Sequence, residues 1–397
     1  MKPESASVLE RAAWLLLCVL IFSLPMEKAI QVPGIGTISR ALGMCAFAAG
    51  AAVVVRRRSL RTPNAALLLA AAFVAWSGVT YFVSLAPEAT LMRVGTLAQL
   101  FAMLWLIWEL CRTAEQEAWL MRAFVAGAAV SSVFTMMRAA RNQQTYYRRF
   151  ATAGFDPNDL GITLALALPM ALYLGFRARG WEAWLYRLAS ALSIAAILLT
   201  ASRTALVTAC LAFTFAVLTW GRATAVHRVS SAALAALLLL GTVRVAPPAA
   251  RQRLATLPAE LTRGTLHDRT RIWKTGLKAY KGHWFAGVGA GAYPEAVRPW
   301  LGVPPIPGHE YTAHNTFLSV MVETGVPGVL LFGSLLMTLT LFIWMMPPVD
   351  RALWFTSLLM WAAGVFTLTW ENRKPTWLLF ALIMVAWARA FRPERER

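Results

Sequence analysis

Charged residues are scarce in this chain. Of its 397 residues, 14% are Asp, Glu, Lys or Arg and 58% are hydrophobic. A soluble globular domain carries about 25% charged residues, and an outer-membrane barrel shows short alternating strands rather than long apolar runs. The composition therefore excludes both classes and favours a helical membrane protein.

Cysteine is also scarce. Cys18, Cys45 and Cys210 fall inside apolar runs, and Cys111 ends one. This distribution predicts neither a disulfide framework nor a metal cluster. We expect no cofactor and no redox chemistry.

Long apolar runs fill most of the chain, and each is long enough to cross roughly 30 Å of hydrocarbon as a helix. They predict an all-α, polytopic integral membrane protein with about twelve transmembrane helices, organised as a single membrane domain over residues 1–397. The predicted spans are 12–30, 36–55, 65–85, 91–111, 119–138, 158–176, 184–200, 204–220, 229–245, 317–346, 351–370 and 376–390.

The first apolar run resembles the core of a signal peptide. No small-x-small cleavage site follows it, and Met26-Glu27-Lys28 interrupts the sequence instead. We therefore expect a retained first helix.

The formal net charge of +19 would suggest a nucleic-acid partner in a soluble protein, but much of it lies in short loops between spans. With a cytoplasmic amino terminus, alternate loops satisfy the positive-inside rule, and we expect membrane lipids rather than nucleic acid as partners. The loops and tail counted as cytoplasmic carry Arg56, Arg57, Arg58, Arg61, Arg112, Arg177, Arg179, Arg187, Arg222, Arg228 and the residues 392–397.

The same orientation places residues 246–316, between the ninth and tenth spans, outside the cytoplasm. We expect this long loop to be mostly helical, with an amphipathic helix over 269–279 and a turn at Gly287-Val288-Gly289-Ala290-Gly291. The Gly-x-Gly pattern follows no βαβ unit, so a dinucleotide site is disfavoured. The loop is strongly basic and attracts anions, either for catalysis or simply for adhesion to lipid headgroups.

Four of the five histidines lie in or at the end of this loop: His267, His283, His309 and His314. His314 stands where the loop re-enters a membrane helix, and an unperturbed imidazole titrates near neutral pH, as a general base requires. Glu310 would orient the ring if the stretch is helical. The alternatives are a helix-terminal structural His314, or His309 as the base.

Arg203 interrupts two apolar runs at the predicted outer end of the seventh and eighth spans. An arginine at the membrane usually faces a partner or a cavity, although snorkelling to the headgroups is the alternative. Arg138 and Arg141 flank another outer loop, and Arg93 lies near a further outer end.

The segment Gly154-Phe155-Asp156-Pro157-Asn158-Asp159 has the pattern of a helix start. Asp156 would be the N-cap and Pro157 the first helical residue. A metal site at Asp156 and Asp159 is the alternative, but no further acidic cluster accompanies it. We favour the cap.

Several short motifs occur in order along the second half of the chain: Ser202-Arg203, Arg269-Thr270-Arg271-Ile272-Trp273, Gly287-Val288-Gly289, Ala313-His314-Asn315, and Glu323-Thr324-Gly325 with Gly328. Together with the element at residues 154–158, this set resembles the O-antigen ligase and polymerase superfamily. The first five spans match that superfamily only in hydropathy.

The resemblance implies a multi-pass protein of the bacterial inner membrane that transfers a glycan at the periplasmic face. The donor would be an undecaprenyl-diphosphate-linked O-antigen and the acceptor the lipid A core, giving full-length lipopolysaccharide. His314 matches the family's essential histidine; Arg203 and Arg269 match its arginines, with Arg271 as the neighbouring candidate. We expect the remaining substrate contacts from Arg271, Arg138, Arg141, Arg93, Asn315, Lys274 and His309.

The residue types agree with that chemistry. Attack on an anomeric carbon needs a deprotonated hydroxyl, for which His314 would accept the proton, and a stabilised diphosphate, which arginine forks would hold. No Asp-x-Asp motif occurs in the long loop. The expected reaction is therefore metal-independent and inverting.

Three other functions remain open. An O-antigen polymerase or a protein O-oligosaccharyltransferase would use the same donor, although the latter often carries an extra carboxy-terminal domain. A lipid or small-solute transporter would instead be expected to show internal repeats and charges near the bilayer middle, and neither is evident in the sequence.

Overall fold

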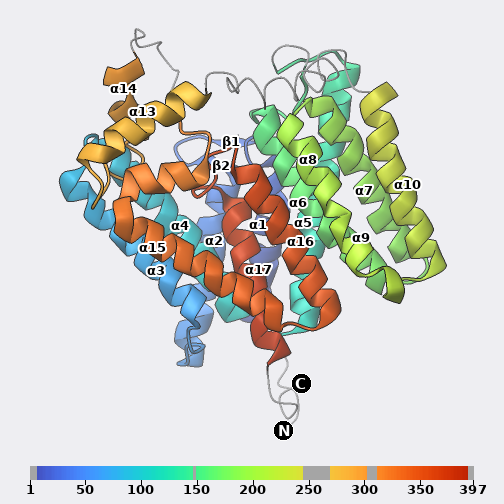
Figure 1. Cartoon of the computed structure of the whole chain (residues 1–397). Coiled ribbons are helices and arrows are strands. Elements are labelled where there is room, and N and C mark those ends of the chain that lie inside the picture. The colour runs from blue at the N-terminus through green and yellow to red at the C-terminus, as the bar shows by residue number, and fades with distance from the viewer. Residues whose placement is uncertain (1–6, 146–148, 245–268, 302–310, 392–397) are drawn as a thin grey trace.

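The computed structural model describes residues 7–145, 149–244, 269–301 and 311–391, and these are mostly helical (Figure 1). The first half contains α1 Val8–Ser23, η1 Leu24–Met26, β1 Gln31–Val32, β2 Gly36–Thr37, α2 Ile38–Arg57, α3 Ala65–Val79, η2 Thr80–Val83, α4 Pro87–Leu110, α5 Ala114–Ala140 and α6 Pro157–Arg177. The second half contains α7 Trp181–Thr200, α8 Arg203–Ala212, α9 Thr214–Leu218, η3 Trp220–Arg222, α10 Ala225–Arg244, α13 Arg269–Gly282, α14 Tyr293–Leu301, α15 Thr316–Met345, α16 Pro348–Val365 and α17 Lys374–Ala390.

In this described part, nine helices are long and apolar enough to cross a membrane. They are α1 with η1, α2, α3 with η2, α4, α5, α6, α7, α10 and α15. The other three predicted spans coincide with α8 and α9, with α16 and with α17. The expectation of an all-α, polytopic membrane protein is thus confirmed.

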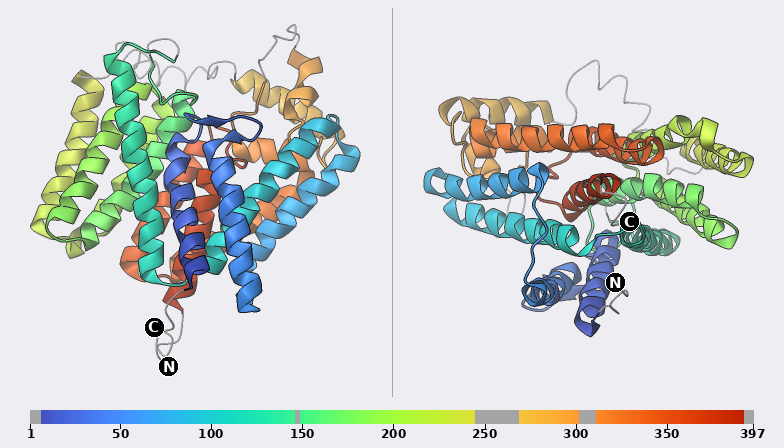
Figure 2. Two further views of the ribbon diagram at one scale, coloured as in Figure 1. Left: turned by 180° about the vertical axis from the view of Figure 1, so that it is seen from behind. Right: turned by 90° about the horizontal axis from the view of Figure 1, so that it is seen from below.

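Two helices form the centre of the bundle. Every residue of α6 from Leu160 to Gly175 is buried, and so is every residue of α17 from Pro375 to Ala386. The other helices surround them, as the view from below shows (Figure 2). Residues at the ends of α6 and α17 are therefore held in a rigid setting.

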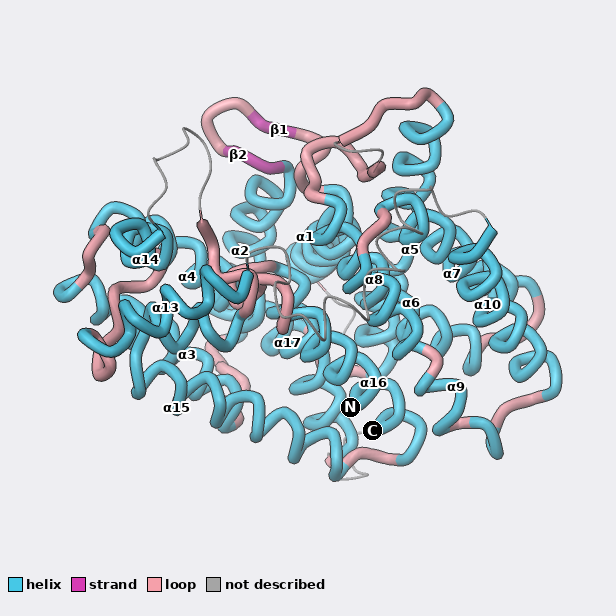
Figure 3. The backbone as a smooth tube through the Cα atoms, turned by 45° about the horizontal axis from the view of Figure 1, so that its top comes forward, coloured by secondary structure: helices cyan, strands magenta, loops and turns pink. Residues whose placement is uncertain are grey.

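The bundle has two distinct ends. α1 begins and α17 ends at the bottom of Figure 1, whereas α13, α14 and the β1–β2 hairpin lie at the top. The hairpin is antiparallel and pairs Gln31 with Thr37 and Val32 with Gly36 (Figure 3). We call the end that carries α13, α14 and the hairpin the loop face.

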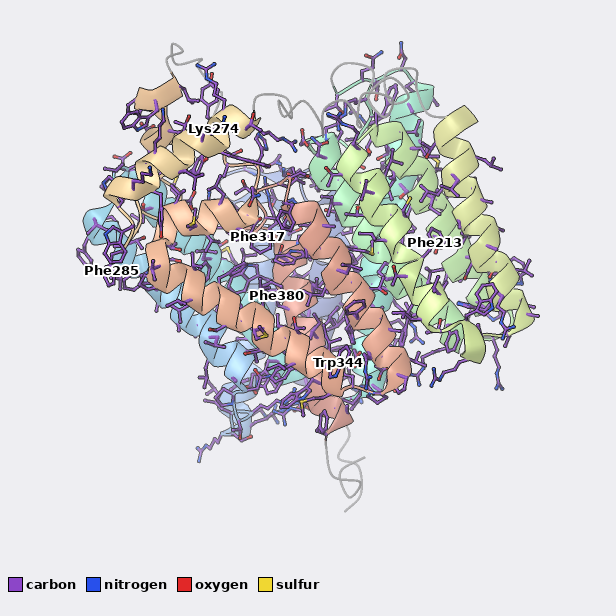
Figure 4. All side chains as sticks on the ribbon, viewed as in Figure 1. Phe213, Lys274, Phe285, Phe317, Trp344 and Phe380 are labelled. Carbon is purple, nitrogen blue, oxygen red and sulfur yellow. The ribbon has the colours of Figure 1, made fainter. Side chains whose placement is uncertain are left out.

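α15 is broken rather than continuous. Gly325 has φ 64° and ψ −164°, and Pro327 follows it, so two helical parts meet at a sharp turn. A Cβ atom at Gly325 would clash with the carbonyl oxygen of Phe285. The chain runs from Phe317 to the edge of the bundle near Phe285 and returns toward Trp344 (Figure 4). The predicted span over 317–346 thus coincides with α15, and the break within it was not predicted.

α16 is shorter than predicted. It ends at Val365, whereas the predicted span continued to Trp370. The residues that follow are irregular up to Arg373, although their Phe, Leu and Trp side chains are as apolar as those of a helix. This irregular stretch lies at the centre of the site described next.

Candidate functional site

A five-residue segment between α16 and α17 joins three helix starts on the loop face. We call Phe366–Trp370 the hub segment. The Thr367 hydroxyl lies 2.7 Å from the hydroxyl of Thr204 on α8. The indole of Trp370 donates to the carboxylate of Asp159 on α6 at 3.0 Å. The starts of α6 and α8 are therefore tied to the same short segment.

The start of α15 is held by the same segment. The Asn315 side-chain amide donates to the Phe366 carbonyl at 3.3 Å, and the Thr316 hydroxyl donates to the Leu368 carbonyl at 2.9 Å. The Thr316 hydroxyl also accepts from the Trp370 backbone N–H. Residues next to Arg203 and next to His314 thus contact neighbouring residues of the hub segment.

Arg203 is the first residue of α8, in a tight turn after α7. Ala201 has φ 49°, in the left-handed region, and Ser202 caps α8 by accepting the N–H of Ala205 at 3.3 Å. Arg203 is half-buried. The turn places this arginine at the loop face.

His314 lies at a second strained position. Its φ is 47°, which a non-glycine residue adopts only where the surroundings enforce it. Asn315, directly after it, caps α15 through the N–H of Leu318 at 2.9 Å. Ala313, directly before it, accepts a hydrogen bond from the indole of Trp273 at 2.8 Å. Both neighbours of His314 are therefore fixed.

The contact of Trp273 also orients α13. Arg269 lies four residues before Trp273 and so on the same side of the helix, toward the segment that holds His314. Arg271 instead donates to the Leu301 carbonyl of α14. Lys274 is exposed on the upper surface of α13 (Figure 4). Of the two candidate arginines, Arg269 thus shares the side of α13 on which Trp273 contacts Ala313, whereas Arg271 contacts α14.

A second contact between α13 and α14 involves Tyr293. The Tyr293 hydroxyl donates to the Ile272 carbonyl at 3.0 Å, and it fits beside Gly276, where any Cβ would meet it. Burial, together with the charge of Glu323, raises the pKa of Tyr293, so this phenol remains a donor. The contact fixes α13, and with it Arg269 and Trp273.

Arg93 is engaged by two carboxylates. Its guanidinium lies 2.7 Å from Glu371 Oε1 and 3.5 Å from Glu323 Oε2. Glu323 also accepts the N–H of Gly291 at 2.7 Å. These contacts join α4, α15 and the segment before α17. They favour a structural role for Arg93, whose expected contact with substrate stays a prediction.

The turn at residues 287–291 uses its amide groups within the protein. Val288 donates to the Val322 carbonyl, Gly289 to the Glu323 carbonyl and Ala290 to the Thr80 hydroxyl. A Cβ at Gly287 would clash with the backbone at Glu323. The glycines are therefore needed for close packing against the break in α15, and these amides are not available to cradle a phosphate.

The other sequence-predicted residues make no described contact with the hub segment, or they lie outside the described part. Arg138 and Arg141 lie at the end of α5 on the loop face, where their described contacts stay within that end. His309 and Glu310 fall outside the described residues, as do residues 245–268 of the long loop. The Asp156 cap is confirmed, since its carboxylate accepts the N–H groups of Asn158 and Asp159.

Sequence reasoning missed the importance of Arg149. Only 3% of this residue is exposed, and its guanidinium donates to the Asn158 side chain at 2.7 Å and to the Thr200 carbonyl at 2.8 Å. It thereby joins the start of α6 to the turn that holds Arg203. The sequence offered only a cluster of basic residues between two spans, with no sign of which one is buried.

Comparison with known proteins shows two similarities. Residues 188–333 match a family model described as O-antigen ligase, a stretch that contains Arg203, Arg269 and His314. The chain is similar to the exopolysaccharide production protein ExoQ of Rhizobium meliloti (strain 1021), with 28% identity over 304 residues, which is 72% of this chain and 67% of that protein. The chain is therefore an all-α, multi-pass membrane protein that is similar to the O-antigen ligase family over residues 188–333.

Proposed function

We propose that this protein is an O-antigen ligase. It transfers O-antigen from undecaprenyl diphosphate to the lipid A core at the periplasmic face of the inner membrane, and the loop face is the periplasmic one. One observation carries the proposal. At one end of the bundle, the hub segment contacts Thr204 next to Arg203 and Asn315 next to His314. At the same end, Trp273 of α13, the helix that begins with Arg269, contacts Ala313 next to His314.

The electrostatics of the loop face support a diphosphate ligand. The starts of α6, α8 and α15 meet at the hub segment, and a helix N-terminus carries about half a positive charge. Arg203 and Arg269 are themselves the first residues of α8 and α13. A cation is unfavourable at that end of a helix unless an anion binds there, so the arrangement is suited to a phosphate group.

The chemistry then follows from the residue types. His314 accepts the proton of the acceptor hydroxyl while the hydroxyl oxygen attacks the anomeric carbon of the donor sugar. The bond from that carbon to the diphosphate oxygen breaks, and its electron pair leaves with the diphosphate. Arg203 and Arg269 stabilise the charge that develops there, each with paired hydrogen bonds. A single displacement inverts the anomeric centre.

We propose that the reaction needs no metal ion, since guanidinium groups and helix starts supply the positive charge. Asp156 is used as the cap of α6, and Asp159 is paired with Arg373 at 3.1 Å. Transfer by the purified protein should therefore persist in the presence of EDTA. Activity that is lost with EDTA and restored by Mg²⁺ would reverse this part of the proposal.

A second candidate function is polymerisation of lipid-linked glycan repeats. The name of the similar Rhizobium protein refers to exopolysaccharide production, which favours this alternative. Both reactions would use the same donor and the same base, and they differ in the acceptor. A polymerase would lengthen the glycan on its lipid carrier, whereas a ligase attaches it to the lipid A core.

The experiment is complementation of a ligase-deficient strain, with lipopolysaccharide resolved by length. The wild-type protein should restore O-antigen ladders, and His314→Ala should abolish them, since loss of a general base costs about 100-fold or more in rate. His283→Ala is the matched control, because the described hydrogen bond of the His283 ring is to Ala279 of its own helix. Wild-type ladders from His314→Ala would remove this histidine from the mechanism. Restored chain length in a polymerase-deficient strain, with no restored ligation, would favour the polymerase.

A further inference from the structure

A separate cavity of about 680 Å³ lies between α2 and α4. Its lining includes none of Arg203, Arg269 and His314. A volume of this size is typical of small-ligand sites. The cavity is therefore a candidate site that the proposed transfer reaction does not use.

The deeper part of this cavity is apolar. Met44 and Phe47 of α2 face Leu100, Met103 and Leu106 of α4 across it. Met44 is 60% exposed and Phe47 is 42% exposed, although both lie on a membrane-spanning helix. The cavity thus opens sideways to the hydrocarbon of the bilayer, where an apolar chain can enter.

The rim of the cavity at the loop face is cationic. It carries Lys28, Arg40, Arg373 and Lys374. Lys374 pairs with Glu27, whereas Lys28 and Arg373 share the single carboxylate of Asp159 at 3.6 and 3.1 Å.

Arg40 donates only to a backbone carbonyl, that of Ile35, among its described contacts. Four cations therefore face two carboxylates at the rim. In addition, the buried Nε–H of Arg373 has no hydrogen-bond partner among the described residues. The rim has both charge and hydrogen-bonding capacity left for an anionic group.

We propose that this cavity binds a membrane lipid with an anionic phosphate headgroup. Its hydrocarbon chain lies between α2 and α4, and its phosphate lies at the rim beside Arg40 and Arg373. The occupant is a lipid rather than free phosphate, because most of the cavity below the rim is apolar. The proposal holds whether the chain acts as a ligase or as a polymerase.

Gly43→Leu tests the site by filling it. A Cβ at Gly43 meets only Leu20 at an ordinary 3.9 Å, and the rest of the leucine extends into the cavity. Gly333→Leu is the matched control, since Gly333 on α15 has open space around it. Arg40→Gln is a second test that changes the charge of the rim. Arg40 is exposed, and its described side-chain hydrogen bond is to the Ile35 carbonyl, so the substitution should disturb the fold little.

The measurement is native mass spectrometry of the full-length protein in detergent with four added probes: phosphatidylglycerol, a polyprenyl monophosphate, phosphatidylcholine and inorganic phosphate. We expect the wild type to retain one or both anionic lipids in preference to phosphatidylcholine. Gly43→Leu should lower that retention about tenfold and Arg40→Gln about fivefold, with Gly333→Leu unchanged. The anionic lipid that is retained better shows whether the bound phosphate belongs to a glycerophospholipid or to a polyprenyl lipid.

Equal retention of phosphatidylcholine would overturn the proposal, as would displacement of the lipid by inorganic phosphate alone. Unchanged retention in both Gly43→Leu and Arg40→Gln would do the same. Because binding is measured rather than glycan transfer, failure here leaves the proposed function unaffected.

Discussion

The hydroxyl groups of Thr204 and Thr367 lie 2.7 Å apart and join the start of α8 to the hub segment. The same segment accepts a hydrogen bond from Asn315, which follows His314. Arg203 and His314 are more than a hundred residues apart in sequence, yet the residue after each of them contacts the hub segment. This arrangement gives the predictions below.

Arg203→Lys should lose most of the transfer activity. Lysine keeps the charge but replaces a planar fork with a point donor, and the loss of one charge-assisted hydrogen bond costs about tenfold or more. The measurement is the rate of glycan transfer by protein in membranes. Arg222→Lys at the opposite end of the bundle is the control and should behave as wild type. Full activity in Arg203→Lys would mean that Arg203 only reaches the headgroups.

Arg269→Gln and Arg271→Gln should have different effects. Arg269 lies on the side of α13 that contacts the His314 segment through Trp273, so its loss should reduce the transfer rate about tenfold or more. Arg271 holds the Leu301 carbonyl, so its loss should mainly lower the melting temperature. The reverse pattern would identify Arg271 as the arginine of the site.

Hydropathy predicted the helices for two reasons. A segment that crosses the bilayer must be apolar over the full hydrocarbon thickness, and it must satisfy its backbone hydrogen bonds internally, as a helix does. Hydropathy could not locate the hub segment, since Phe366, Leu368 and Trp370 are as apolar as the helix before them. Nor could it locate the break at Gly325, which depends on the close approach of Phe285.

Candidate site residues could be named from the sequence, but the residues that hold them in place could not. His314 and Arg203 stand at the ends of apolar runs, where a polar residue is conspicuous. The partners of Arg93 are 230 and 278 residues away in sequence, and no local pattern records such pairs. The burial of Arg149 likewise depends on Asn158 and Thr200, which belong to other helices.

Thr367→Val should lower stability by about 1 kcal/mol, because it leaves the Thr204 hydroxyl without its partner. Thr204→Val should cost less, because the Thr367 hydroxyl still donates to the Gly364 carbonyl at 3.2 Å. The double variant should be less destabilised than the sum of the two, since both polar groups are then removed. Thermal melting in detergent measures both effects. Strict additivity would mean that the two hydroxyls are not coupled.

Arg93→Met should destabilise the protein by about 3 kcal/mol, because it leaves the buried carboxylates of Glu323 and Glu371 without their cation. Adding Glu371→Gln should recover part of the loss. Thermal melting in detergent measures the stability of both variants, and the transfer rate of the folded fraction is measured in parallel. A variant that melts like wild type but transfers poorly would instead assign Arg93 to substrate binding.

The central claim is that Arg203 and His314 face one site on the periplasmic side. Its most direct test is a cysteine-free background, with the four native cysteines replaced, that carries Arg203→Cys and His314→Cys together. An impermeant maleimide added from the periplasm should label both positions, and a short bis-maleimide should cross-link them, while Arg179→Cys at the opposite end should remain unlabelled. Labelling of the two positions from opposite sides of the membrane, or labelling without any cross-link, would contradict the account.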